Sequence, residues 1–336
     1  MKRRHRRQLR KALRRGAIVF AGLVVALLIA ELVVRAGGLA PLPDAGLEGV
    51  GSDNSEHGCH VPHQTRGWAA AADTCGRDQH GMIPDPAADG SPVVLVVGDS
   101  IATLRTWLNG TGDALREVYP EAQVLSAGHS GYNTCQEYQL VRELIGPVHP
   151  DLVVLQTCPN DIGGSPVLVP LGEGRMRYFV GDRSFDAPGV LFYSHLATAA
   201  LVRFGAATLA EPSAFEGSAG VAYFDSCLSA LRDTLVSREI PLVAVHFPVL
   251  AAPGVESERP HFRKEAHIVE QTTALAIPAL ELRPLLEAQG DMASHRPDDL
   301  DYIHPNKQAQ ALIGDALGPW LLEHLAAPGA QGPPEP

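Results

Sequence analysis

Val93-Val94-Leu95-Val96-Val97-Gly98-Asp99-Ser100 is the stretch of sequence that decides the fold of this chain. Its aliphatic run followed directly by glycine predicts a strand that is buried on both faces, as in a parallel sheet, and that ends in a tight turn. In open α/β sheets, ligands bind outside the carboxyl ends of the strands. Ser100 therefore stands where its hydroxyl would point into the usual ligand-binding site of such a sheet. The Gly-Asp-Ser tripeptide alone is, however, also explained as a turn and a helix N-cap.

The rest of the chain continues this strand in a regular alternation. We expect further strands at 123–126, 152–156, 242–247 and 277–282, and helices over 102–118, 134–145, 219–238, 258–275 and 307–325. Such alternation predicts a parallel, doubly wound α/β sheet in one domain over residues 91–325. Residues 162–218 interrupt the alternation and predict an insertion near the site, with a hairpin over 175–185 and a helix over 192–204.

The N-terminus differs sharply in charge from the rest of the 336-residue chain. Residues 1–15 hold nine of the 27 Lys and Arg residues and no acid, so 18 basic residues face all 38 acidic residues in the remainder. A body this acidic argues against nucleic acid as a partner. The basic arm runs into residues 17–34, an apolar stretch broken only by Glu31, and with Gly16 this makes about 19 residues, enough to cross a hydrocarbon core.

This pattern predicts four segments outside the folded domain. We expect a basic cytoplasmic arm at 1–15, a transmembrane helix at 16–35, an extracytoplasmic Gly/Pro-rich spacer at 36–90 and a disordered tail at 326–336. A secretory signal cleaved after Gly38 is the competing interpretation. A twin-arginine signal at Arg14-Arg15 fits the flanking residues poorly.

The five cysteines show no paired spacing suited to zinc. Export would permit disulfides, and Cys59 and Cys75 bracket a loop-like stretch with little core, so we predict a bridge between them. The odd number leaves at least one thiol unpaired or intermolecular. The spacer histidines form no metal-binding helix motif, and we expect no metal site from them: His57, His60 and His63.

Loops at the ends of separate elements carry complementary chemistry. Ser100 offers a hydroxyl, and Asp301 and His304, three residues apart in one loop, offer a base and the carboxylate that orients it. Gly131 allows its backbone N–H to approach a ligand closely, and Asn160 carries an amide donor at a strand end. An alcohol nucleophile needs a base, and its attack needs donors for the oxyanion, so this set of residues predicts a serine hydrolase.

These residues resemble the sequence blocks of the GDSL or SGNH hydrolases. The resemblance spans about residues 93–320 and rests on four blocks in the family's order: Gly98-Asp99-Ser100, Gly131 in Ser-Gly-Tyr-Asn, Asn160-Asp161, and Asp301-x-x-His304. It implies a three-layer α/β/α flavodoxin-like fold and ester hydrolysis through an acyl-enzyme, without a metal or an organic cofactor. One departure is Cys158, which stands where the third block usually has glycine.

The resemblance also implies a role for each matched residue. Ser100 would be the nucleophile, His304 the general acid and base, and Asp301 the residue that fixes the imidazole tautomer. The backbone N–H groups of Ser100 and Gly131 and the side chain of Asn160 would hold the oxyanion. Asp99 and Asp161 are expected to be structural. The rivals, Ser130 for the nucleophile and Asp298 and Asp299 for Asp301, fit the pattern less well.

The sequence thus predicts a membrane-tethered, extracytoplasmic serine esterase that hydrolyses acyl or acetyl esters, with an acylated glycan or lipid as its substrate. An O-acyltransferase acting on envelope glycans is the near alternative, because the same acyl-enzyme serves both reactions. A non-catalytic envelope assembly or binding module is the alternative from another class. The complete Ser, Gly, Asn and His set argues against that module.

Overall fold

A computed structural model describes most of the folded body of the chain. The described residues are 15, 20, 22–33, 60–63, 66–70, 72, 73, 76–85, 87, 89–162, 167–172, 175–180, 183–188, 197, 218–251, 259–298 and 301–325.

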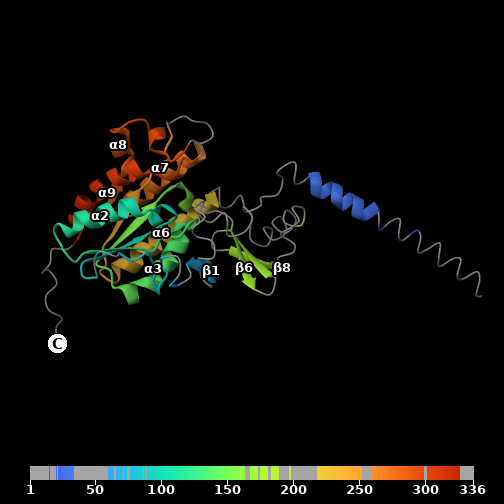
Figure 1. Ribbon diagram of the computed structural model, residues 1–336, viewed down its shortest axis with the longest axis horizontal. Helices are drawn as coiled ribbons and strands as arrows, with labels where there is room; N and C mark the ends of the chain where they lie inside the picture. The colour runs from blue at the N-terminus through green and yellow to red at the C-terminus, as the bar shows by residue number, and fades with distance from the viewer. Residues whose placement is uncertain are drawn as a thin grey trace, which may run out of the picture.

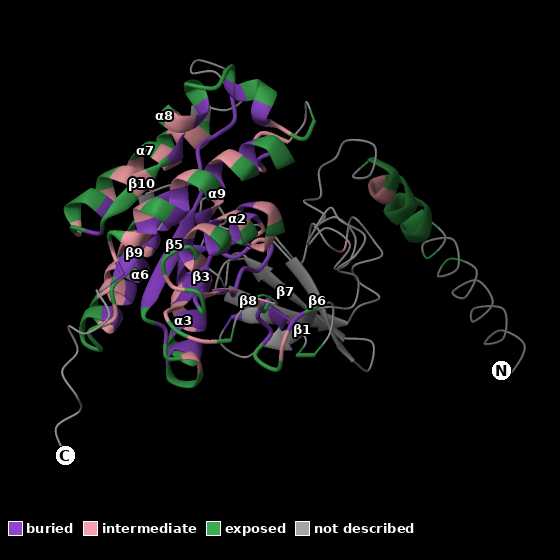
Figure 2. Cartoon of the chain, turned by 60° about the vertical axis from the view of Figure 1, so that its left-hand side comes forward, coloured by how far each residue is buried: buried purple, intermediate pink, exposed green. Residues whose placement is uncertain are grey.

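A five-stranded sheet forms the centre of the body, and all of its strands run parallel (Figure 2). Its strands in chain order are β3 (Val93–Val97), β4 (Gln123–Ser126), β5 (Leu152–Thr157), β9 (Leu242–His246) and β10 (Ala279–Glu281). Their spatial order is β10-β9-β5-β3-β4, so the first strand lies between the second and the third. This is the doubly wound, flavodoxin-like order, and the predicted parallel sheet is confirmed.

Helices cover both faces of the sheet and complete three layers (Figure 1). On one face, α3 (Thr134–Val148) and α6 (Ser218–Val236) pack against inward side chains such as Leu95 and Leu155. On the other, α2 (Arg105–Arg116), α8 (Leu282–Glu287) and α9 (Lys307–Leu322) pack against side chains such as Val96 and Val154. Helix α7 (Arg259–Ala274) adds Ile268 to the core of the first face. Successive residues of a strand point to opposite faces, which explains why the run at 93–97 is apolar throughout.

The segment before the sheet packs onto the body, and here the structure differs from the expected spacer. Met82 is in the core, and Ile83 forms an antiparallel bridge with Ser126 at the end of β4. The buried Arg77 donates to the carbonyl of Gly128 at 3.0 Å, and the buried Arg66 donates to the Tyr132 hydroxyl at 2.9 Å. The described residues of 66–70 and 76–85 therefore belong to the folded body, and they brace the turn that contains Gly131.

Two small antiparallel sheets accompany the central one. One pairs β1 (His60–His63) with β2 (Gly67–Ala70), which the sequence did not predict. The other joins β6 (Val167–Gly172), β7 (Arg175–Val180) and β8 (Arg183–Pro188). The predicted hairpin in the insertion is thus confirmed as β7 and β8, with β6 as an additional strand. The helix expected over 192–204, apart from Ala197, and the tail at 326–336 lie outside the described residues.

Residues 22–33 of the predicted membrane span are helical, and their large apolar side chains are exposed. No helix within the described residues is long and apolar enough to cross a membrane. Residues 16–19, 21, 34 and 35 of the predicted span lie outside the described part of the chain. The transmembrane helix therefore stays a prediction.

A disulfide joins Cys135 of α3 to Cys227 of α6, across a sequence separation of 92 residues. The two helices pack side by side on one face of the sheet, so the bridge ties neighbouring elements that are distant in the chain (Figure 2). The sequence did not predict this pair. Cys59 and Cys75, the pair that it did predict, lie outside the described residues.

We predict that replacing Cys135 and Cys227 together by serine lowers the free energy of unfolding by about 2–5 kcal/mol, because the bridge closes a long loop in the unfolded chain. Urea unfolding of the wild type and the double variant measures the difference. Peptide mapping without reduction should find these two cysteines joined, and the same digest tests the Cys59–Cys75 prediction. Free alkylation of both residues in unreduced, denatured protein would contradict the bridge.

Candidate active site

Ser100 lies just beyond the end of β3 and is the N-cap of a short 3-10 turn, η2 (Ile101–Thr103). Gly98 makes the exit from the strand possible, because a Cβ at this position would overlap the Gln156 side chain of the neighbouring β5. The carbonyl of Ser100 accepts hydrogen bonds from the N–H and the hydroxyl of Thr103, at 3.1 and 2.6 Å. The turn therefore fixes the backbone of Ser100 and leaves its side chain at the carboxyl edge of the sheet.

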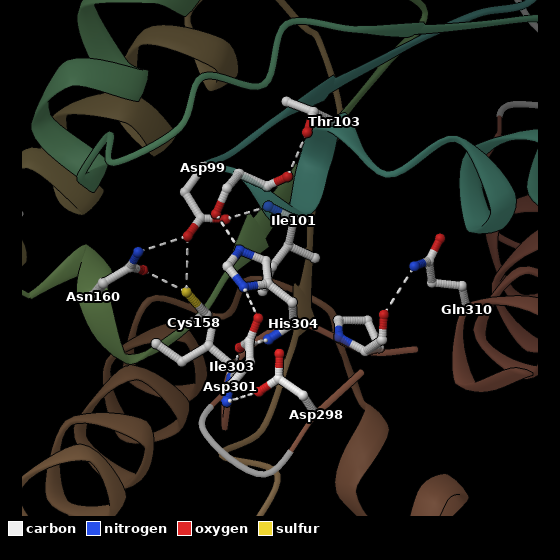
Figure 3. Close-up of polar contacts among 12 residues, drawn as sticks. Asp99, Ile101, Thr103, Cys158, Asn160, Asp298, Asp301, Ile303, His304 and Gln310 are labelled. Atoms are coloured by element: carbon white, nitrogen blue, oxygen red, sulfur yellow. Dashed lines mark hydrogen bonds and ion pairs between the residues drawn. The ribbon is translucent and has the colours of Figure 1, made fainter. Parts of the chain in front are cut away.

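The hydroxyl of Ser100 meets a histidine that lies 204 residues later in the chain. The distance between Ser100 Oγ and His304 Nε2 is 2.7 Å, and that between His304 Nδ1 and Asp301 Oδ2 is 2.8 Å (Figure 3). The other oxygen of Asp301 accepts the N–H groups of Ile303 and His304 at 3.1 and 2.9 Å. A carboxylate can only accept, so the Nδ1 of His304 carries the proton and Nε2 is free to accept one from Ser100.

Burial and hydrogen bonding set the charges of this pair. Burial raises the pKa of Asp301, but hydrogen bonds from His304 and Ile303 outweigh it and hold the pKa below its usual value. Burial lowers the pKa of His304, whereas the hydrogen bond and charge of Asp301 and the charge of Asp99 raise it, with a net increase. Asp301 is therefore ionised at neutral pH, and His304 is a stronger base than an ordinary histidine.

The loop that carries Asp301 and His304 is anchored at several points along its length. Asp298 Oδ1 accepts the N–H of Asp301 at 2.9 Å, and the N–H of Leu250 donates to the carbonyl of Tyr302 at 2.8 Å. Asn306 caps α9 by accepting the N–H of Ala309 at 2.9 Å, and its amide donates to the carbonyls of Ser294 and Arg296. The start of α9 thus holds the imidazole opposite the end of β3.

Asp99 is fully buried and connects the Ser100 turn with the turn after β5. Its Oδ1 accepts the N–H of Ile101 at 2.9 Å, and its Oδ2 accepts the amide of Asn160 at 2.7 Å (Figure 3). Its own N–H donates to Gln156 Oε1 at 3.1 Å. Asn160 belongs to another 3-10 turn, η3 (Pro159–Asp161), so Asp99 places two of the sequence-predicted site residues relative to each other.

Cys158, which is the departure from the resembled sequence blocks, does not distort its loop. Its φ of −151° lies in the extended region, which any residue adopts. Its thiol is 3.1 Å from Asp99 Oδ2 and also contacts Asn160 Oδ1, while its N–H donates to Asp161 Oδ2 at 2.6 Å. Burial and the charges of Asp99 and Asp161 raise the pKa of the Cys158 thiol well above its ordinary value, so it stays protonated and is not a nucleophile.

Gly131 lies in the turn between β4 and α3 and has a φ of +76°, a conformation that favours glycine. Hydrogen bonds attach the turn to the end of β3, because Ala127 N–H donates to Val96 at 2.8 Å and His129 N–H donates to Gly98 at 3.1 Å. The adjacent Asn133 caps α3 in a reciprocal capping box with Gln136. The turn is therefore rigid on both sides of Gly131.

The structure brings together the predicted Ser100, Asp301 and His304 in one hydrogen-bonded chain. The rival Ser130 is buried in the β4–α3 turn, and the rival Asp298 supports the backbone of Asp301. The rival Asp299 lies outside the described residues. Sequence reasoning gave no role to Gln156, although a single amide within an otherwise apolar strand is a signal that could have revealed it.

No protein-family model matches this chain, and no curated protein matches it. Similar solved structures include a lipase/acylhydrolase from Enterococcus faecalis, with 16% identity, coverage of 70% of this chain and 98% of that chain, and a TM-score of 0.45. The acetyl xylan esterase AlAXEase is similar at 14% identity, with coverage of 68% of this chain and 98% of that chain and a TM-score of 0.44. A GDSL-like lipase from Bacteroides thetaiotaomicron is similar at 15% identity, with coverage of 69% of this chain and 88% of that chain and a TM-score of 0.41.

We predict that Asp301→Asn lowers the pKa of His304, because it removes the charge that raises it. NMR titration of the imidazole measures this pKa directly. In the wild type it should lie above the ordinary value of about 6.5, and in the variant it should fall. Asp298→Asn is the matched control, since asparagine can still accept the Asp301 N–H and the carboxylate beside His304 remains. An unchanged His304 pKa in Asp301→Asn would contradict the assignment.

Proposed function

We propose that this protein is a serine hydrolase that cleaves carboxylic esters through an acyl-enzyme. The observation that carries the proposal is the continuous hydrogen-bonded chain from Ser100 through His304 to Asp301. An unassisted serine hydroxyl is a weak nucleophile, and a neutral imidazole within 2.7 Å of its oxygen is the arrangement that activates it.

The reaction proceeds in two steps. As Ser100 Oγ attacks the ester carbonyl, its proton passes to His304 Nε2, and the charge of Asp301 stabilises the imidazolium. The imidazolium then donates this proton to the departing alkoxide, which leaves an acyl group on Ser100. In the second step His304 takes a proton from water, the resulting hydroxide attacks the acyl carbonyl, and Ser100 regains its proton.

Three donors would stabilise the oxyanion: the N–H groups of Ser100 and Gly131 and the amide of Asn160. An amide nitrogen carries two hydrogens. In Asn160 one of them is directed to Asp99 Oδ2 at 2.7 Å, which fixes the plane of the amide and leaves the second N–H for the oxyanion.

We predict that Ser100→Ala abolishes covalent labelling by a fluorophosphonate and lowers turnover of p-nitrophenyl acetate by about 10⁴-fold or more, since the acyl-enzyme cannot form. Ser130→Ala is the matched control and should retain labelling and turnover. His304→Ala should lose nearly as much turnover as Ser100→Ala. Undiminished labelling in Ser100→Ala, or its loss in Ser130→Ala, would overturn the assignment.

The same assay tests the oxyanion donor. Asn160→Ala should lower kcat by about 10²- to 10³-fold with little change in KM, because the donor acts on charge that develops only in the transition state. A second measurement adds a glycan acceptor. Release of the free carboxylic acid indicates hydrolysis, whereas an acylated glycan indicates acyl transfer.

We also propose that the enzyme is tethered to a membrane with its catalytic domain outside the cytoplasm. Nine basic residues precede the apolar stretch at 17–34, and the positive-inside rule keeps such an arm in the cytoplasm. The disulfide between Cys135 and Cys227 supports export, because disulfides persist mainly in oxidising compartments.

We predict that a reporter fused after residue 325, active only when exported, is active and stays with the membrane fraction. A matched control carries neutral residues in place of the nine basic ones and should lose this fixed orientation. Inactivity of this reporter, or a soluble mature protein that begins near Leu39, would contradict the tether.

A further inference from the structure

Three carboxyl groups are buried in the turns that carry Ser100 and Asn160 and in the start of α3, and the proposed reaction uses none of them directly. Asp99 follows β3, Asp161 ends η3, and Glu137 lies in the first turn of α3. All three are almost completely inaccessible to solvent. Asp99 is well supplied with donors, whereas within the described residues both oxygens of Glu137 and the Oδ1 of Asp161 have no hydrogen-bond partner.

Glu137 and Asp161 interact within this buried cluster, and each changes the pKa of the other. Two ionised carboxylates can only accept, so neither would satisfy the other. Burial, with the charges of Asp161 and Asp99, raises the pKa of Glu137 well above its ordinary value, and burial with the charge of Asp99 does the same for Asp161. One proton held between the two groups supplies the missing donor and removes one buried charge.

Glu137 and Asp161 link the Gly131 turn and the Asn160 turn, which would supply the two oxyanion donors other than the N–H of Ser100. Glu137 is separated from Gly131 only by Tyr132 and the first residues of α3, whose start is held by the Asn133 cap. Asp161 accepts the N–H of Cys158 at 2.6 Å and so closes the turn that contains Asn160. A bond between these two carboxyl groups therefore connects the Gly131 turn with the Asn160 turn.

We propose that Glu137 is a positioning residue of this enzyme, which fixes the distance between the Gly131 and Asn160 donors through a proton shared with Asp161. The inference rests on the proposed ester hydrolysis and deepens it. Glu137 touches neither the substrate nor the reacting atoms. Its effect is exerted through the two turns, so it should act on the transition state and leave substrate binding almost unchanged.

The test compares Glu137→Leu with Glu137→Gln in steady-state hydrolysis of p-nitrophenyl acetate. Leucine has a similar size but no donor, so kcat should fall by about 10- to 100-fold while KM changes by less than about threefold. Glutamine can donate its amide to Asp161 and should keep kcat within about threefold of the wild type, because the bridge is preserved. Gln139→Leu, on the same helix and outside the cluster, is the matched control and should keep both constants.

Thermal unfolding shows which variants are folded. If Glu137→Leu does not fold, Glu137→Gln and Asp161→Asn decide the question, since each retains one donor and one acceptor between the two positions, and each should keep kcat near that of the wild type. Wild-type kcat in folded Glu137→Leu overturns the proposal, as does a loss in Glu137→Gln equal to that in Glu137→Leu. Wild-type turnover that persists in Ser100→Ala would instead refute the proposed function, so the two failures are distinguishable.

Discussion

The five strands of the central sheet all run parallel, and this constraint places every part of the candidate site. Parallel strands direct their carboxyl ends to one edge, so the residues that follow β3, β4 and β5 must meet there. Ser100, Gly131 and Asn160 follow these three strands in turn. The last loop before α9 then reaches the same edge and brings His304 to Ser100.

The buried carboxylate of Asp99 is the second determinant of the site. A charge without access to water is strongly unfavourable unless donors surround it. Here the donors are Ile101, Asn160 and the Cys158 thiol, which belong to two different turns. The electrostatic requirement of one buried group therefore fixes the geometry of the Ser100 turn and the Asn160 turn together. The charge of Asp99 also contributes to the raised pKa of His304.

Residues 66–85 show why composition misled the prediction of a spacer. The segment is short of regular hydrophobic periodicity, which is typical of a linker. Its attachment depends on single long-range contacts instead, such as those of Arg66 with Tyr132 and of Arg77 with Gly128. The sequence alone does not distinguish an arginine that is buried and hydrogen-bonded within the protein from one that is exposed to solvent. The strand β6 was missed for a related reason, because antiparallel pairing with β7 completes it.

The sequence by itself determined the parallel sheet, because a doubly buried strand needs an unbroken apolar run. It also indicated the candidate site residues, which stand in loops between such elements. Only the tertiary structure decided which groups meet. The Cys135–Cys227 bridge, the connection of Asn160 to Asp99, and the facing carboxyl groups of Glu137 and Asp161 depend on the spacing of packed helices and turns. Contacts of this kind join residues that are far apart in the chain, and their distances are set by side-chain packing, which local sequence patterns do not encode.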